Sequence, residues 1–171
     1  MGAFSVSPSG EPPGARSVGR LRGYRRWGQL AAGWSLIFAV VHVFWAVGGE
    51  TGLASSAGEA LAASRPAWFV AVGLWGTAAL LLLVGGIGVA AAGAGSTVHS
   101  RRWAKVGAGL IAAVLLLRSV GVEVLLVSDA GGVAEAVGRG ERDASLWVWN
   151  PWFLLGGVLF ALATLTVHDR R

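Results

Sequence analysis

Four long runs of apolar residues, separated by short segments that carry most of the charges, are the strongest constraint on this chain. The runs cover residues 27–47, 67–92, 103–127 and 146–167. A bilayer contains about 30 Å of hydrocarbon, which a helix crosses in about 20 residues, so each run is long enough to span it. Only 13% of the residues are charged, whereas soluble domains carry about 25%. Because a helix satisfies its own backbone groups in lipid, the sequence predicts an all-α fold, a transmembrane four-helix bundle.

The basic residues gather at alternate ends of these runs and give the bundle a direction. They lie before the first run, around the start of the third and after the fourth: Arg16, Arg20, Arg22, Arg25, Arg26, Arg101, Arg102, Lys105, Arg170 and Arg171. The other two connections carry both signs of charge without a basic excess. Since cytoplasmic loops are rich in lysine and arginine, we predict that both termini are cytoplasmic. Basic residues that flank spans also explain the net charge of +5 without a nucleic-acid partner.

We divide the chain into a lead and one membrane domain. Residues 1–23 contain several Pro, Gly and Ser residues and too few apolar ones to fold alone, so we expect a disordered basic cytoplasmic lead. We expect residues 24–168 to form the four-span domain. The first run exceeds the roughly 7–15 apolar residues of a signal-peptide core, so we expect it to be retained as a span. Internal repeats are not evident beyond the shared apolar character of the runs.

Three ionisable side chains, His42, Arg118 and Glu123, fall in the outer half of the membrane. Arg118 lies about 3 Å beyond the midpoint of the third run, where inserting an arginine costs about 2.5–3.5 kcal/mol. We therefore expect it to face the bundle interior and to have a polar partner. Glu123 is rotated from it by about 140° around the helix, so the partner is either Glu123, reached by the long arginine side chain, or a residue of another helix.

Other residues reach the same level of the membrane. His42, Trp45 and Gly49 follow i, i+3, i+7 spacing and share one helix face, and Asn150 and Trp152 begin the fourth run. We predict a ligand-binding pocket near the outer face, lined by His42, Trp45, Gly49, Arg118, Glu123, Asn150 and Trp152. A second interpretation remains open, in which the polar groups only satisfy one another and hold the helices in register.

Tryptophans and glycines predict how the spans sit and pack. Tryptophans near the ends of the runs, including Trp34, Trp45, Trp68, Trp103 and Trp147, suit the aromatic belts at the membrane surfaces. Small residues let membrane helices approach closely. We therefore expect helix contacts at Gly73, Gly76, Gly85, Gly86, Gly88, Gly107, Gly109, Gly156 and Gly157.

Several kinds of chemistry are excluded or weakly supported. The chain has no cysteine, which excludes disulfides, thiolate metal sites and cysteine nucleophiles. One histidine and one carboxylate in the outer half fall below the three or four ligands that zinc takes, so we expect no metal and no cofactor. No P-loop or dinucleotide-binding motif is present.

The stretch His42-Val-Phe-Trp45-Ala46-Val-Gly48-Gly49 is similar to the His-x-x-Trp-Ala-x-Gly-Gly motif of a family of small bacterial four-span membrane proteins of unknown function. Asn150-Pro151-Trp152, at the start of the last run, resembles that family too. The resemblance covers about residues 27–167 and implies a multi-pass protein of the bacterial plasma membrane. It supplies no reaction and no substrate.

Three functions are compatible with the sequence. The preferred one is a binding or permeation module for a small or lipid-like ligand, in which Arg118 attracts an anionic group. Four spans lack the broken helices typical of secondary transporters, so permeation would call for a homo-oligomer. The second is a structural or assembly subunit of a membrane complex. The third, which we rank last, is a membrane-embedded enzyme in which His42 and Glu123 share acid and base roles.

Overall fold

The computed structural model describes residues 13–93, 97–128 and 139–165, and the secondary structure within these ranges is entirely helical. In chain order the elements are α1 (Pro13–Ala46), α2 (Leu53–Ala57), α3 (Glu59–Ser64), the π-helical segment η1 (Phe69–Gly76), α4 (Thr77–Ala91), α5 (Val98–Ser128), α7 (Arg139–Ala144), the π-helical segment η3 (Ser145–Trp149) and α8 (Asn150–Thr164). The predicted all-α class is confirmed.

Four helical stretches are long and apolar enough to cross a membrane: Arg26–Ala46, Phe69–Ala91, Val98–Ser128 and Gly140–Thr164. They match the four predicted runs, as expected of a multi-pass membrane protein. α1 already begins at Pro13, inside the 1–23 segment that we expected to be disordered, and residues 1–12 lie outside the described residues. Proline suits the first turn of a helix, and an established helix extends readily through the Ala, Arg and Leu residues that follow.

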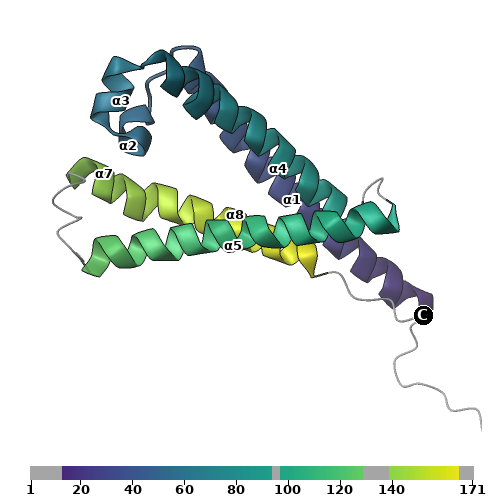
Figure 1. The fold of residues 1–171 in the computed structure, drawn as a ribbon. Coiled ribbons are helices and arrows are strands. Elements are labelled where there is room, and N and C mark those ends of the chain that lie inside the picture. The colour runs from purple at the N-terminus through teal and green to yellow at the C-terminus, as the bar shows by residue number, and fades with distance from the viewer. Residues whose placement is uncertain (1–12, 94–96, 129–138, 166–171) are drawn as a thin grey trace, which may run out of the picture.

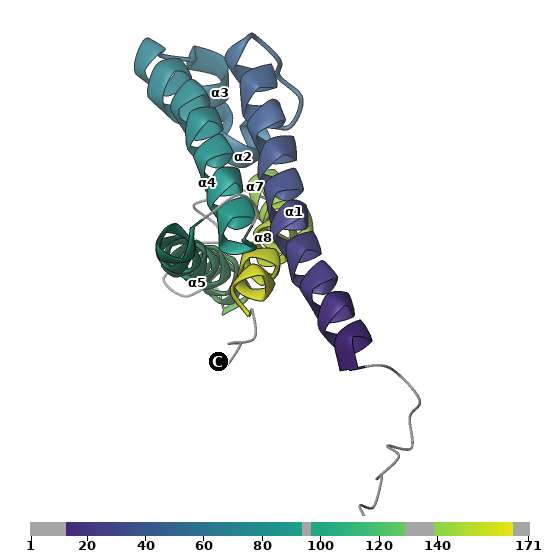
Figure 2. The same ribbon diagram turned by 90° about the vertical axis from the view of Figure 1, so that its right-hand side faces the viewer.

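The long helices form two antiparallel hairpins, α1 with η1 and α4, and α5 with η3 and α8 (Figure 1). The hairpins pack through α1 on α8 and through α4 on α5. They converge near the start of α5 and separate toward the end that carries α2, α3 and α7 (Figures 1 and 2). At that separated end α2 contacts α7 and η3, so the connections close the space between the hairpins.

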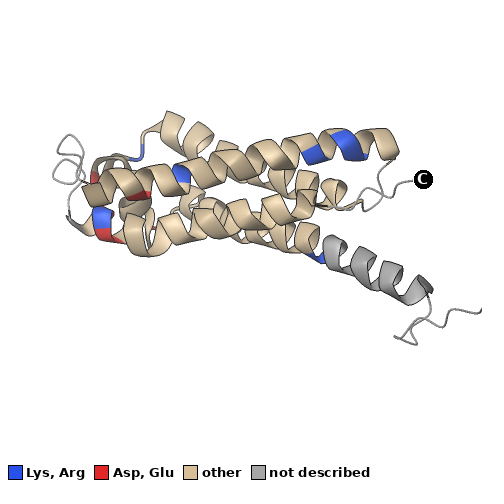
Figure 3. Cartoon of the chain, turned by 90° about the horizontal axis from the view of Figure 1, so that it is seen from below, with Lys and Arg blue, Asp and Glu red and all other residues tan. Residues whose placement is uncertain are grey.

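The charged side chains are divided between the two ends of the bundle (Figure 3). Near the end where α5 begins, the described charges are basic: Arg26, Arg101, Arg102 and Lys105. Carboxylates gather at the opposite end, together with arginines (Figure 3). The separation agrees with the charge pattern from which we predicted cytoplasmic termini, while the orientation itself stays a prediction.

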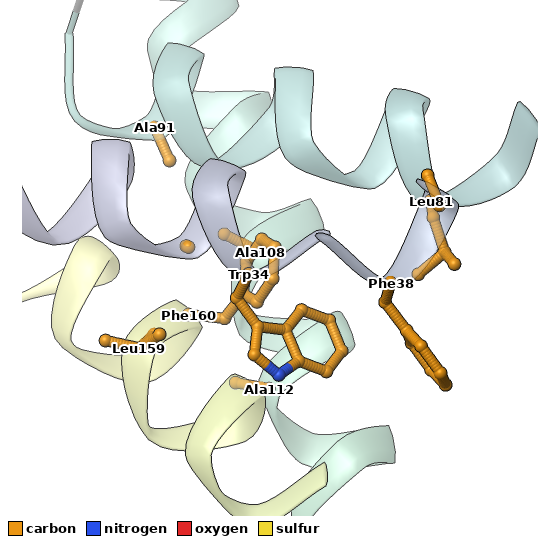
Figure 4. Close-up of a cluster of buried hydrophobic side chains, with 10 residues drawn as sticks. Trp34, Phe38, Leu81, Ala91, Ala108, Ala112, Leu159 and Phe160 are labelled. Atoms are coloured by element: carbon orange, nitrogen blue, oxygen red, sulfur yellow. The ribbon is translucent and has the colours of Figure 1, made fainter. Parts of the chain in front are cut away.

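The main core lies where the hairpins cross and is centred on Trp34 of α1 (Figure 4). Its indole stacks on Trp152 of α8 at a centroid distance of 5.7 Å, and its Nε1 donates to the carbonyl oxygen of Trp152 (3.0 Å). A Cβ at Gly156 would lie 2.5 Å from the indole, so glycine makes the room that Trp34 fills. Trp34 is therefore a core residue, and the prediction that it belongs to an aromatic belt is wrong.

A second cluster secures the connections and consists of the buried side chains of Trp45, Leu53, Phe69 and Leu74. Trp45 Nε1 donates to the carbonyl oxygen of Thr51 (2.8 Å), which ties the end of α1 to the chain that leads into α2. The belt prediction is thus wrong for Trp45 as well, because the connection folds back over it. The tryptophans that are exposed, as a belt requires, include Trp68, Trp103 and Trp147.

The predicted glycine contacts are confirmed at some positions and wrong at others. A Cβ on Gly28 of α1 would lie 2.6 Å from the carbonyl oxygen of Gly88 of α4, so these helices touch at their backbones. A Cβ on Gly157 would lie 2.7 Å from Cγ of Leu116 on α5. At two predicted positions a Cβ would meet nothing within 4 Å: Gly86 and Gly109. These two glycines lie on helix faces turned away from the other spans.

Candidate functional site

A cavity of about 530 Å³ lies between the two hairpins. This volume falls within the range of about 300–1,000 Å³ that is usual for small-molecule sites. Most of the lining side chains are aliphatic or aromatic. The polar lining consists of three hydroxyls and two ionisable groups: Ser56, Thr77, Ser145, His42 and Arg118. A mainly apolar chamber with a few polar groups is typical of a ligand-binding site.

The cavity has a buried floor and an open mouth. Its lining residues on α1 are Trp34, Phe38 and His42, with 3%, 6% and 8% of their surface exposed. On α4 and α5, by contrast, Leu80 and Val114 line the same cavity and are 58% and 65% exposed. The floor therefore lies on α1, and the mouth opens between α4 and α5, where apolar side chains of both helices are exposed.

Arg118 of α5 lines this cavity and is held by two groups of the fourth span. Its Cζ lies 4.1 Å from the ring centroid of Phe153, a distance at which a cation is attracted to an aromatic face. Its Nη1 donates to Oδ1 of Asn150 (3.1 Å). Within the described residues, no carboxylate forms an ion pair with the guanidinium. Arg118 thus has a polar partner, and that partner is neutral.

The side-chain amide of Asn150 connects Arg118 to Glu123 and so forms a hydrogen-bond relay between them. The amide Nδ2 of Asn150 donates to Oε2 of Glu123 (2.8 Å), while its Oδ1 accepts from Arg118. The backbone oxygen of Asn150 accepts from Oγ of Ser119 (2.9 Å). Asn150 is only 2% exposed and lies in the contact between α5 and α8. Of the two partners that the sequence left open for Arg118, the structure therefore shows the one on another helix, with Glu123 behind it.

The irregular start of the fourth span positions Asn150. The π-helical segment η3 ends at Trp149, α8 begins at Asn150, and Pro151 follows. Proline cannot donate a backbone hydrogen bond, and its ring crowds the carbonyl of the preceding turn. A widened π turn just before it leaves room for the ring.

His42 is the second ionisable group of the cavity. Its Nδ1 lies 2.9 Å from the carbonyl oxygen of Phe38. A carbonyl only accepts, so Nδ1 carries a hydrogen and Nε2 is left for another partner. The imidazole packs edge-on against Phe38 and Trp45, at centroid distances of 4.7 and 5.1 Å. These contacts fix the ring at the cavity wall.

Glu123 and Asn150 do not line the cavity between the hairpins. They line a separate groove of about 310 Å³, together with Ser119 and Pro151. The rotation of about 140° between Arg118 and Glu123 puts the two residues on different faces of α5. His42 and Glu123 consequently lie against different spaces, so the structure does not bring together the pair that an acid–base mechanism would use.

The remaining predicted site residues, Trp45, Gly49 and Trp152, line neither space. Trp45 is a member of the second cluster, and Trp152 packs against the main core. Gly49 follows the end of α1, where Gly48 has a φ of 115° that favours glycine. The seven predicted residues are therefore divided between a cavity, a groove, the hydrophobic clusters and, for Gly49, the chain that follows α1.

Arg65 is a residue whose role the sequence did not reveal. It follows α3, and its guanidinium donates to the backbone oxygens of Trp45 and of Gly49, the latter at 3.3 Å. A cation suits this place because the carboxyl end of a helix carries partial negative charge. A basic residue in the connection after an outgoing span is the signal that could have indicated this cap.

A family described as "Protein of unknown function (DUF3995)" matches residues 35–160, which include both His42 and Arg118. The match covers well over half of the chain. The chain belongs to this family. No curated protein and no solved structure matches it. Membership in DUF3995 agrees with the resemblance noted from the sequence, while the functional weight of the His-x-x-Trp motif stays a prediction.

Proposed function

We propose that the protein binds an amphipathic anion, a molecule with one acidic head group and an apolar tail, in the cavity between the hairpins. The proposed location is the bacterial plasma membrane, with both termini cytoplasmic. This location rests on the family resemblance and on the basic end of the bundle.

The observation that carries the proposal is a guanidinium that lines an apolar cavity without an ion pair in the described residues. Arg118 is exposed rather than buried within the protein, and a cation at this level of a span is costly in lipid unless an anion lies close to it. Asn150 holds Glu123 behind the arginine, away from the cavity. None of the described carboxylates lines the cavity, so an acidic head group bound there would place an anion beside Arg118.

The shape of the cavity supports an apolar tail. Its walls are mainly aliphatic and aromatic, and its mouth lies between α4 and α5, where apolar side chains of both helices are exposed. In the proposed membrane location such a side faces lipid, so a ligand dissolved in the bilayer can enter without passing through water. One chain supplies the whole lining, so binding does not depend on the homo-oligomer that permeation would call for.

The alternative functions have less support. An assembly subunit would use its polar residues to contact partners, but Arg118 and Glu123 both form hydrogen bonds to Asn150 within the chain. An acid–base enzyme would need His42 and Glu123 at one substrate, but they line different spaces.

The test is binding of radiolabelled palmitate to the purified protein in phosphatidylcholine nanodiscs, with hexadecanol as an uncharged competitor of equal chain length. We expect palmitate to bind and hexadecanol to compete poorly. Arg118→Leu should weaken palmitate binding roughly tenfold or more, as loss of a charge-assisted hydrogen bond predicts.

Arg102→Leu is the matched control, since Arg102 is an exposed arginine at the basic end of the bundle and should leave binding unchanged. The proposal fails if the native protein does not bind palmitate, or if the Arg118 and Arg102 variants bind it equally well.

A further inference from the structure

We infer that the two hairpins are equivalent halves of an internally repeated chain, and that His42 and Arg118 occupy the same place in the two halves and contact one acidic head group together. This inference rests on the proposed function for its ligand. The repeat itself rests on sequence and structure.

The two outgoing spans begin with the same residues. Arg25-Arg26-Trp27 leads into the first span and Arg101-Arg102-Trp103 into the third, 76 residues later. Five of the nine residues from 25 to 33 are identical to those from 101 to 109 at this spacing. These matches support an internal repeat that the shared apolar character of the runs does not make evident. The similarity fades beyond residue 33, which is why apolar composition alone concealed it.

The same spacing relates the cavity walls. Trp34, Phe38 and His42 line the cavity from α1. The residues 76 positions later, Leu110, Val114 and Arg118, line the same cavity from α5. Except at His42 and Arg118, these are large apolar residues on both walls. The lining residues are those that surround the cavity in the structure, whereas the 76-residue spacing comes from the sequence alone. The two observations are therefore independent.

The fold has the matching symmetry. If the two hairpins are exchanged, α1 corresponds to α5 and α4 to α8. The contact between α1 and α8 then corresponds to the contact between α5 and α4, and the structure contains both. Each return span begins with a π-helical segment, η1 in one hairpin and η3 in the other. Each connection also supplies an arginine to the carboxyl end of its outgoing helix. Arg65 donates to the backbone oxygen of Trp45, and Arg142 Nη2 to that of Leu126 (3.1 Å).

The pairing of His42 with Arg118 defines the ligand further. Arg118 donates hydrogen bonds, whereas Nε2 of His42, with Nδ1 bonded to Phe38, either accepts the proton of an acid or donates once it holds that proton. A single acid group can meet both demands, because one of its oxygens accepts from Arg118 while its proton is shared with His42. A carboxylic acid and a monoester of phosphoric acid both have this chemistry. A binding site between repeats is also the arrangement found in many membrane transport proteins.

The test is an exchange of the two residues in the palmitate assay, with hexadecyl phosphate as a second probe that separates carboxylate from phosphate heads. Arg118→His should weaken binding roughly tenfold, because a charge-assisted hydrogen bond is lost. If the positions are equivalent, the double variant His42→Arg with Arg118→His should regain most of the native affinity for whichever probe binds. A folded double variant that binds as weakly as Arg118→His would overturn the equivalence. Absence of binding to the native protein would instead overturn the proposed function.

A second measurement does not depend on the exchange, and the absence of cysteine makes it simple. Phe38→Cys and Val114→Cys place single thiols at equivalent positions of the two walls. Bound ligand should slow the reaction of both thiols with N-ethylmaleimide. A thiol from Leu117→Cys is the control, because Leu117 is 73% exposed and lines neither the cavity nor the groove. Protection of only one of the two walls contradicts the shared site.

Discussion

Asn150 offers the sharpest test of how the polar groups hold the bundle together. Replacing it by leucine keeps a side chain of similar size but removes two interhelical hydrogen bonds, one from Arg118 and one to Glu123. The bond from Ser119 to the backbone oxygen of residue 150 remains. Interhelical side-chain hydrogen bonds in membranes contribute about 0.6 kcal/mol on average and up to about 1.7 kcal/mol, so we expect Asn150→Leu to lower the free energy of unfolding by about 1–3 kcal/mol.

The assay is reversible unfolding in mixed micelles of mild detergent and sodium dodecyl sulfate, followed by the loss of helical circular dichroism. Gln29→Leu is the matched control. It also replaces an amide in a span by leucine, but Gln29 is exposed and makes no side-chain hydrogen bond to the described part of the chain. We expect it to change the unfolding free energy by less than about 0.5 kcal/mol.

A double-mutant cycle between Asn150→Leu and Glu123→Ala isolates the contact itself, and its coupling energy should be at least about 0.5 kcal/mol. Equal stability of the Asn150 and Gln29 variants, or a coupling energy of zero, would refute the relay.

Three further predictions concern packing, capping and orientation. Gly157→Ala should lower stability by about 1–3 kcal/mol in the same assay, because its Cβ would overlap a leucine of α5, whereas Gly109→Ala, with open space around it, should not. Arg65→Leu should speed amide hydrogen exchange in the last turn of α1, since each lost bond to a carbonyl contributes about 1 kcal/mol. A cysteine at Glu59 should react with an impermeant maleimide in intact cells, and one at Ser100 only after lysis; the reverse pattern would contradict cytoplasmic termini.

Features that depend on the length and polarity of single spans could be predicted from the sequence. The four spans follow from apolar runs that match the thickness of a bilayer. The need of Arg118 for a polar partner follows from the cost of a charge in lipid. The placement of His42, Arg118 and Asn150 in the half of the bundle that carries α2, α3 and α7 also follows from their depth along each helix, while their role in a site and the orientation of the bundle stay predictions. None of these predictions requires knowledge of how one helix is rotated against another.

Features that depend on rotation and close packing could not be predicted. Which wall His42 and Glu123 face is set by the contacts that fix each helix about its own axis. One such contact seats the indole of Trp34 on Gly156, more than a hundred residues away in the chain. The same packing converts Trp34 from an expected surface anchor into the centre of the core. The different surroundings of the seven candidate residues therefore depend on how the two hairpins pack, which the sequence of a single span does not reveal.

The neutral amide between Arg118 and Glu123 explains how a charge can be both tolerated in the membrane and available to a ligand. A direct ion pair would satisfy the guanidinium and cancel most of its field on the cavity side. Electrostatic attraction falls with distance, so a carboxylate held behind an amide balances the charge of the arginine more weakly. The arginine then keeps part of its attraction for an anion in the cavity, while the relay still ties α5 to α8. Stability and binding are thereby linked, and Asn150→Asp, which sets a carboxylate directly against Arg118, should weaken palmitate binding even where the protein stays folded.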